Sequence, residues 1–298
     1  MKKLGWIGCG NMGRPMAANL LKHGYDVTVF DVVEENARKL EAVGAHRAAT
    51  PREVVERTDC FFTMLPNGKI LESVVLQPET GIAAGLRPGK IFVDMSTIAP
   101  AESLHVCKTV EESGCGFLRA PVTGSTALAE SAALGVFASG KQELYNEVLP
   151  MFQCLSNNQH YLGDGEQARV LKLAINLMVA ANMQLLAECM TLVDKAEIDR
   201  AQAMEIIRAS AAGSPVINYK TANVVNRDYT AAFSVAMMEK DLDLALDAAK
   251  QFNVALPVTA LTRQFLSAVH EQGNANQDFS YLVAFWENMH GVGADAIH

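Results

Sequence analysis

Three glycines near the N-terminus have the spacing G-x-G-x-x-G, which is typical of a turn that binds phosphate groups. The motif runs from Gly8 to Gly13 and carries Asn11 and Met12 after its central Gly10. It follows a short apolar run and precedes a helical pattern, which is the context in which this motif binds a dinucleotide. Gly8 would permit the tight turn, Gly10 the approach of a pyrophosphate, and Gly13 close packing of the helix on the strand.

Asp31 ends the next β-rich run, 18 residues after Gly13. A carboxylate at this place can accept hydrogen bonds from both ribose hydroxyls of NAD, whereas it would repel the 2′-phosphate of NADP. No arginine directly follows it to compensate. The sequence therefore predicts a dinucleotide site that takes NAD rather than NADP; the alternative is a glycine turn beside a surface aspartate.

Lys172 lies in an apolar helical stretch between Leu171 and Leu173, and Asn176 follows four residues later on the same helical face. Buried polar groups in such a helix are costly unless they are used. Hydride transfer between an alcohol and a nicotinamide requires a group that moves the hydroxyl proton, and burial helps a lysine to release one. We expect Lys172 to be this group; a snorkelling lysine and a buried polar bridge at Asn176 are the alternatives.

Thr123, Gly124 and Ser125 follow another apolar run. Backbone N–H groups and hydroxyls at such a turn can hold a carboxylate without a cation. The alternative is a plain connection between a strand and a helix. The six cysteines form no C-x-x-C pair and no histidine lies at ligand spacing from them, so no metal site is predicted.

The first half of the chain alternates short β-rich runs with helical patterns, which predicts a doubly wound parallel sheet. The pattern changes after residues 163–165, because residues 166–197 contain neither proline nor glycine and are apolar on almost every face. We therefore expect an α/β fold: a Rossmann-type domain over residues 1–163, then an all-α domain over residues 164–298, joined by a long buried helix. Strands are predicted at residues 4–7, 26–30, 60–65, 91–95, 117–122 and 135–138, and later helices at residues 201–212, 237–252, 258–272 and 281–289.

The net charge of -8 argues against nucleic acid and against an anionic membrane as partners. No uninterrupted apolar run approaches 18 residues, so no membrane span is expected. The N-terminus lacks the pattern of a signal peptide, and the unpaired cysteines suit a reducing compartment. These features predict a cytoplasmic protein with a small-molecule substrate.

Residues 8–20 read G-C-G-N-M-G-R-P-M-A-A-N-L, which resembles the G-x-G-x-M-G-x-x-M-A-x-N-L signature of the β-hydroxyacid dehydrogenase family. This family includes 3-hydroxyisobutyrate dehydrogenase and tartronate semialdehyde reductase, and its fold is like that of 6-phosphogluconate dehydrogenase. Later blocks agree in order and spacing at residues 64–66, 94–97, 120–124, 172–176 and 240–242.

The resemblance implies a role for each block. Leu65, Pro66 and Thr97 would line the cofactor near its nicotinamide end. Thr123 and Gly124 would hold the substrate carboxylate, with Ser125 beside them. Lys172 would be catalytic with Asn176 at its side, and Lys240 would close over the cofactor from the α-domain.

Several positions depart from the family pattern and bear on the substrate. Arg119 replaces the usual aspartate before the Ala-Pro pair, which leaves two interpretations: it binds a second anionic group of the substrate, or it forms a structural ion pair. The departures weaken the case for 3-hydroxyisobutyrate itself. The others are Thr123 for serine, Ser125 for glycine, Ile175 for asparagine, and Glu166 and Ala168 for two glycines.

We therefore expect hydride transfer between NAD and a small β-hydroxy acid or its semialdehyde, with Lys172 as general acid and base. One alternative is an NADPH-preferring reductase of a small C3–C5 or sulfonated semialdehyde, and another is a dinucleotide-binding module without catalysis. Because the apolar helix at residues 166–197 exceeds what one small α-domain can cover, we also expect a homodimer or homotetramer.

Overall fold

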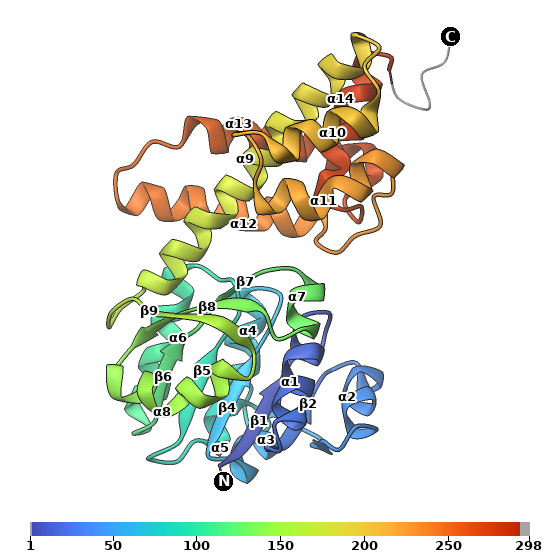
Figure 1. Ribbon diagram of the computed structural model, residues 1–298. Helices are drawn as coiled ribbons and strands as arrows, with labels where there is room; N and C mark the ends of the chain where they lie inside the picture. The colour runs from blue at the N-terminus through green and yellow to red at the C-terminus, as the bar shows by residue number, and fades with distance from the viewer. Residues whose placement is uncertain (1, 293–298) are drawn as a thin grey trace. The chain divides into compact units, whose positions relative to one another are not determined.

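The computed structural model describes residues 2–292, and the chain divides into two compact units, Met1–Lys172 and Leu173–His298 (Figure 1). The first unit carries a β-sheet with helices and the second is helical, which confirms the expected fold class. The limits expected from the sequence, 1–163 and 164–298, follow a change in composition. The division by contacts falls later because it lies inside a continuous helix, Gln167–Lys195.

The sheet of the first unit has the strand order β3-β2-β1-β4-β5-β6-β8-β7, with β9 beside β8. Its neighbours are parallel from β3 through β6, whereas β8 is antiparallel to both β6 and β7 and parallel to β9. Because β1 lies between β2 and β4, the strand order reverses there, and ligands bind outside the carboxyl ends of the strands at such a point. The strands are β1 (Lys3–Ile7), β2 (Asp26–Phe30), β3 (His46–Arg47), β4 (Cys60–Thr63), β5 (Ile91–Asp94), β6 (Gly116–Arg119), β7 (Val122–Thr123), β8 (Leu134–Gly140) and β9 (Ser156–Tyr161).

Helices connect the strands of the first unit, and their starts follow local capping signals. Thr50 accepts a hydrogen bond from the backbone of Glu53 and so caps α3, and Asn67 caps α4 in the same way through Ile70. The helices are α1 (Gly13–Lys22), α2 (Glu34–Glu41), α3 (Pro51–Arg57), α4 (Gly68–Leu76), α5 (Ile82–Gly85), α6 (Pro100–Glu112), α7 (Thr126–Glu130) and α8 (Gln142–Gln153).

The central strands are buried on both faces, as expected for a parallel sheet between two layers of helices. All four residues of β4 and all four of β5 are buried. On one face Trp6 stacks on Phe62 at a ring distance of 5.3 Å, and on the other face Phe61 stacks on Phe92 at 4.7 Å. Trp6 also donates a hydrogen bond to the carbonyl oxygen of Gly8 at 3.0 Å, which anchors the glycine turn to the core.

The second unit contains the larger part of α9 (Gln167–Lys195) and a set of shorter helices. Its core gathers the buried face of α9 with residues of every later α-helix and with Phe279 from a 3-10 turn. The starts of α11 and α12 are capped by Ser214 and Ser234. The later elements are α10 (Arg200–Ala209), α11 (Pro215–Asn226), α12 (Val235–Gln251), α13 (Pro257–Val269), a π-helical turn (His270–Asn274), a 3-10 turn (Phe279–Tyr281) and α14 (Leu282–Met289).

Helix α9 was expected to be buried all round, but its two long faces differ in exposure. Ala180, Met183, Ala187 and Met190 are completely buried, at the spacing of one helical face. On the opposite face, seven residues apart, Leu171, Met178, Leu185 and Leu192 are 36%, 61%, 63% and 71% exposed. The described residues of one chain therefore cover only part of the apolar surface of α9.

Judged by length and composition alone, α9 could also cross a membrane. The most apolar 18-residue window of this helix has a mean hydropathy of 1.6, and 39% of that window is buried. A helix that is apolar all round can equally belong to a protein core. The expectation of no membrane span rested on the absence of an uninterrupted apolar run, since Asn176, Asn182, Gln184 and Glu188 interrupt this helix, and it stays a prediction.

Candidate active site

The glycine turn packs tightly against the sheet and opens to one side. Gly8 has φ +94°, and a Cβ there would overlap the carbonyl oxygen of Met64. A Cβ on Gly13 would overlap the carbonyl oxygen of Gly8. Gly10 differs, because no atom of the described residues lies within 4 Å of where its Cβ would be. The turn therefore needs glycine for its own packing at two positions and faces open space at the third.

The N-terminus of α1 has no side-chain cap, although the backbone N–H of Arg14 donates to the carbonyl oxygen of Gly10 at 3.0 Å. Met12 is the N-cap residue, and its side chain makes no capping hydrogen bond. Side chains of serine, threonine, asparagine or aspartate cap α3, α4, α7, α10, α11 and α12, whereas α2, α5, α8, α13 and α14 lack a side-chain cap, as α1 does. The first N–H groups of a helix have no partner within the helix, and with the helix dipole they attract an anion. This end of α1, beside the open space at Gly10, suits a pyrophosphate.

Asp31 closes the same turn from the end of β2. Its Oδ2 accepts a hydrogen bond from the backbone of Cys9 at 2.6 Å, and its Oδ1 accepts one from Val33 at 2.8 Å. Because each carboxylate oxygen can accept about two hydrogen bonds, Oδ2 can also accept from a ribose hydroxyl. The next two side chains, Val32 and Val33, are 83% and 54% exposed and offer no positive charge.

The thiol of Cys9, inside the turn, stays neutral. Burial, and secondly the charge of Asp31, raise the pKa of Cys9 to about 12. The turn therefore adds no second negative charge where phosphates would bind. Together with the open space at Gly10, the uncapped helix and the carboxylate of Asp31, this fits a nicotinamide dinucleotide.

The residues expected at the nicotinamide end follow two neighbouring strands. Leu65 and Pro66 come after β4, and Thr97 comes after β5. Hydrogen bonds fix both segments at the carboxyl edge of the sheet: the backbone N–H of Met64 donates to Ile7 at 3.0 Å, and that of Leu65 donates to the hydroxyl of Ser96 at 2.9 Å. Because β1 and β4 are parallel neighbours, these segments lie at the same edge as the glycine turn.

The segment expected to hold a carboxylate connects β7 to α7. Thr123 ends β7 opposite Gly135, and Gly124 has φ +133°, a backbone conformation that favours glycine. Ser125 has a structural use, because its Oγ accepts a hydrogen bond from the backbone of Leu128 at 3.4 Å and caps α7. The turn is thus ordered by its own side chain, and Thr123 and Gly124 remain partly or fully exposed beside it.

Lys172 and Asn176 are both buried, with 8% and 6% of their surface exposed. A lysine whose amine reached bulk solvent would be more exposed, so this burial argues against the snorkelling alternative. The amide nitrogen of Asn176 donates to a carboxylate oxygen of Asp241, which is 1% exposed, and the amine of Lys240 pairs with the other oxygen at 2.9 Å. Asp241 lay in a family-like block, but sequence reasoning gave it no role.

The structure also distinguishes between the two interpretations of Arg119, a substrate-binding cation or a structural ion pair. Its guanidinium Nε donates to Oε1 of Glu166 at 2.6 Å, and Arg119 is only 4% exposed. This contact supports the interpretation that Arg119 forms a structural ion pair and argues against the interpretation that it binds an anionic group of the substrate. The two residues that depart from the family pattern at these positions therefore pair with each other. They are 47 residues apart in sequence, so no local signal predicts the pairing.

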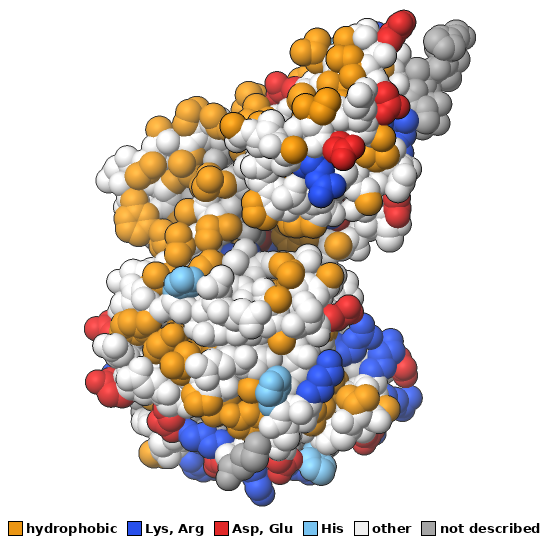
Figure 2. Space-filling view, in the orientation of Figure 1, with side chains coloured by type: hydrophobic (Ala, Val, Ile, Leu, Met, Phe, Trp, Pro, Cys, Tyr) orange, Lys and Arg blue, Asp and Glu red, His pale blue; other side chains and the backbone are white. Residues whose placement is uncertain are grey.

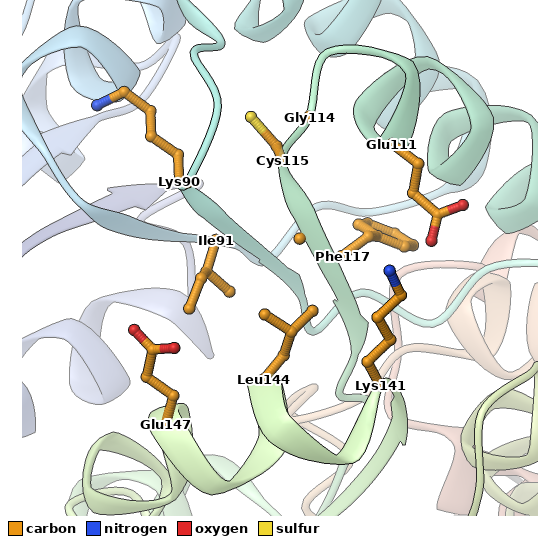
Figure 3. Close-up of a pocket in the computed structure, with 11 residues that line it drawn as sticks. Lys90, Ile91, Glu111, Gly114, Cys115, Phe117, Lys141, Leu144 and Glu147 are labelled. Atoms are coloured by element: carbon orange, nitrogen blue, oxygen red, sulfur yellow. The ribbon is translucent and has the colours of Figure 1, made fainter.

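A separate pocket of about 400 Å³ lies at the opposite edge of the sheet (Figure 3). Lys90 and Gly116, at the amino ends of β5 and β6, line it together with Lys141 from the start of α8. Because the strands are parallel, this edge is remote from the glycine turn. The pocket carries lysines and glutamates in mixture, and none of the residues expected to act in the site lines it.

The chain matches two protein-family models that together cover most of its length. Residues 3–163 match the NAD binding domain of 6-phosphogluconate dehydrogenase, and residues 166–286 match the model described as NAD-binding of NADP-dependent 3-hydroxyisobutyrate dehydrogenase.

Individual proteins are similar over nearly the whole chain. The 2-(hydroxymethyl)glutarate dehydrogenase of Eubacterium barkeri is 33% identical over 291 residues, which are 97% of this chain and 96% of that protein. The 2-hydroxy-3-oxopropionate reductase of Escherichia coli (strain K12) is 31% identical over 96% of this chain and 98% of its own length. A solved structure of Mycobacterium tuberculosis 3-hydroxyisobutyrate dehydrogenase with L-serine has a TM-score of 0.85 at 26% identity, covering 96% of this chain and 99% of that one.

Proposed function

The chain belongs to the β-hydroxyacid dehydrogenase family of NAD(P)-dependent oxidoreductases, and from this premise we propose that Lys172 moves the proton when hydride passes between NAD and a small β-hydroxy acid or its semialdehyde. The observation that carries the proposal is the burial of Lys172 one helical turn before the buried Asn176 on α9. Their spacing of four residues puts both side chains on one face of the helix.

A bound nicotinamide supplies the acceptor or donor of the hydride, so the protein has to orient the substrate and handle one proton. In the oxidation direction Lys172 takes the proton of the substrate hydroxyl, and in the reduction direction it returns a proton to the carbonyl oxygen. In this proposal the buried amine exchanges its proton with the substrate oxygen and not with bulk solvent. The same residue therefore serves both directions.

Asn176 orients the substrate hydroxyl in this proposal, and Asp241 fixes the amide. The buried carboxylate of Asp241 accepts the amide N–H of Asn176 and also pairs with Lys240. An amide held in this way presents one defined orientation to its surroundings. Lys240 would contribute to the cofactor site, as the family resemblance implied.

The substrate carboxylate would bind at Thr123 and Gly124. The exposed Gly124, with its positive φ, can turn backbone N–H groups toward an anion, and the hydroxyl of Thr123 adds a donor. The site would be uncharged, because Arg119 is already engaged by Glu166. A β-hydroxy acid with a single carboxylate, separated from its reacting carbon by one further carbon, fits this arrangement.

NAD is the proposed cofactor in preference to NADP. In this proposal the carboxylate of Asp31 would repel a 2′-phosphate, and the exposed side chains that follow, Val32 and Val33, carry no compensating charge. The rival function is an NADPH-preferring reductase of a small semialdehyde. Steady-state rates with NADH and NADPH, over a panel of small hydroxy acids and semialdehydes, separate the two.

A homodimer or homotetramer is the proposed assembly. The apolar residues Leu171, Met178, Leu185 and Leu192 recur every seven residues on the exposed face of α9, which is the repeat of a seam between helices. A further exposed apolar group, including Phe252, covers the connection between α12 and α13 (Figure 2). Exposed apolar surface of this extent marks a protein interface.

The decisive experiment replaces Lys172. We expect Lys172→Ala to abolish turnover while NAD binding survives, and Lys172→Arg to be equally inactive, because a guanidinium keeps its proton. Lys195→Ala, at the exposed end of the same helix, is the control and should leave kcat unchanged. Activity of Lys172→Ala near that of the unaltered enzyme would refute the assignment.

A further inference from the structure

Arg169, three residues before Lys172, is almost completely buried and makes several polar contacts. It is 1% exposed, its Nη2 donates to Oδ2 of Asp94 at 2.6 Å, and its Nη1 donates to the carbonyl oxygen of Ser96 at 2.9 Å. Its Nε lies 3.3 Å from Oε2 of Glu166. The first turn of α9 is therefore attached to the end of β5 by a buried guanidinium.

A second arginine holds Glu166 from another strand. Arg119 ends β6, and its Nε donates to Oε1 of Glu166 at 2.6 Å; the hydroxyl of Ser103 on α6 donates to the same oxygen at 3.1 Å. Two arginines and two carboxylates thus meet with no net charge. Such a group is tolerated inside a protein only when each charge has a partner.

The same group reaches the segments expected to line the nicotinamide. Oδ1 of Asp94 accepts hydrogen bonds from the hydroxyls of Thr63 at 2.5 Å and Ser96 at 2.7 Å. Ser96 in turn accepts from the backbone of Leu65 at 2.9 Å, and Thr97 is the next residue in the chain. One polar network therefore joins the ends of β4, β5 and β6 to the start of α9.

We propose that Asp94, Glu166, Arg119 and Arg169, here named the α9 clamp, position the amine of Lys172 relative to the cofactor segments that contain Leu65 and Thr97. The inference rests on the proposed function, because it matters only if Lys172 moves the proton. Arg169 and Lys172 are neighbours on the helix surface at a spacing of three residues. A displacement of about 1 Å at a reacting group can lower a rate roughly 100-fold, so a fixed first turn has a direct effect on kcat.

Each member of the clamp acts through another residue. Arg119 is buried and engaged by Glu166, so it reaches the reaction only by holding the start of α9. A purely structural role would lower stability without changing kcat, KM or the pH profile of the folded enzyme. A positioning role lowers kcat and displaces the pH profile while the affinities for NAD and substrate stay close to their original values.

The test uses the full chain with Arg119→Gln and Glu166→Gln combined, which removes one arm of the clamp as a neutral pair and keeps the contact of Asp94 with Arg169. We expect kcat to fall between about 10-fold and 100-fold, with the Kd for NAD and the KM within about threefold, and a displaced pH profile of kcat. The matched control is Arg200→Gln with Glu287→Gln, another buried ion pair. It should lower the Tm and leave kcat unchanged.

A second, more conservative variant tests the proposal even if the double variant does not fold. Arg119→Lys keeps the positive charge but loses the guanidinium geometry, so kcat should fall about threefold or more with KM unchanged. A kcat within twofold of the original value in either folded clamp variant overturns the clamp proposal, and so does an equal loss of kcat in the control. Activity of Lys172→Ala would instead refute the proposed function, whatever the clamp variants do. An inactive Lys172→Ala with fully active clamp variants refutes the clamp alone.

Discussion

Replacing Gly10 by alanine should weaken cofactor binding without weakening the fold. No atom of the described residues lies within 4 Å of the added Cβ, and Gly10 does not have a positive φ, so alanine fits the free protein. Such a change raises stability by about 0.4–1 kcal/mol, because the unfolded chain loses freedom. The methyl group would occupy the space through which the backbone approaches a pyrophosphate. We expect the Kd for NAD to rise at least tenfold, or about 1.4 kcal/mol.

The contrast is Gly13→Ala, where the added Cβ meets the carbonyl oxygen of Gly8 and lies 2.8 Å from the ring nitrogen of Trp6. That carbonyl also accepts the Trp6 hydrogen bond at 3.0 Å, so relieving the overlap disturbs a buried contact. We expect this variant to lose about 1–3 kcal/mol of stability as well as affinity.

Two measurements on each purified variant separate these effects. Thermal unfolding without cofactor should show Gly10→Ala at or above the original Tm and Gly13→Ala below it. Titration calorimetry with NAD should show weaker binding for both. If Gly10→Ala bound NAD as tightly as the unaltered chain, the open side of the turn would not be the pyrophosphate site, and the reasoning from Gly10 would be refuted.

Three further predictions concern the cofactor, the assembly and the thiols. Asp31→Asn with Val32→Arg should raise kcat/KM with NADPH at least about tenfold, because it replaces a repelling carboxylate by a cation. Leu185→Glu should convert the oligomer to monomers in sedimentation velocity at micromolar concentration, because a charge interrupts the apolar seam. Iodoacetamide at about pH 8 should modify the exposed Cys189 before Cys9, because only a thiolate reacts and burial raises the pKa of Cys9 to about 12.

Each of these predictions has an opposing result. If the variant with Asp31→Asn and Val32→Arg kept the original ratio of rates with NADH and NADPH, Asp31 would not determine which cofactor is preferred. An unaltered chain that already sediments as a monomer would contradict the proposed seam on α9. Peptide mass spectrometry that found Cys9 labelled first would contradict its burial beneath the turn.

The sequence predicted those features of the fold that depend on residues close together in the chain. The glycine spacing, the carboxylate at the end of β2 and the strand-helix alternation each depend on residues close in sequence, and the structure has all three. Strand β9 was not predicted, because its residues, S-N-N-Q-H-Y, show no apolar alternation. It forms beside β8, whose backbone supplies the hydrogen bonds, and the pairing of β8 with β6 and β7 likewise depends on tertiary contacts.

The long-range polar contacts of the site could not be predicted in the same way. Asp94 and Arg169 are 75 residues apart, and Asn176 and Asp241 are 65 apart. No spacing rule connects such residues, although a lone charge in an apolar run, as at Asp94, is a signal that a partner exists. Composition predicted that one α-domain could not cover this apolar helix, but it did not show which face of α9 stays exposed.

The pairing of Arg119 with Glu166 restricts how this enzyme can exchange segments with its relatives. The family pattern has an aspartate and a glycine at these positions, so a chimaera with a crossover between them would bury either an arginine without its glutamate or a glutamate beside an aspartate. A crossover outside this interval keeps the two residues together, whereas a crossover within it separates them. Replacing either residue alone would leave the other charge buried without its partner.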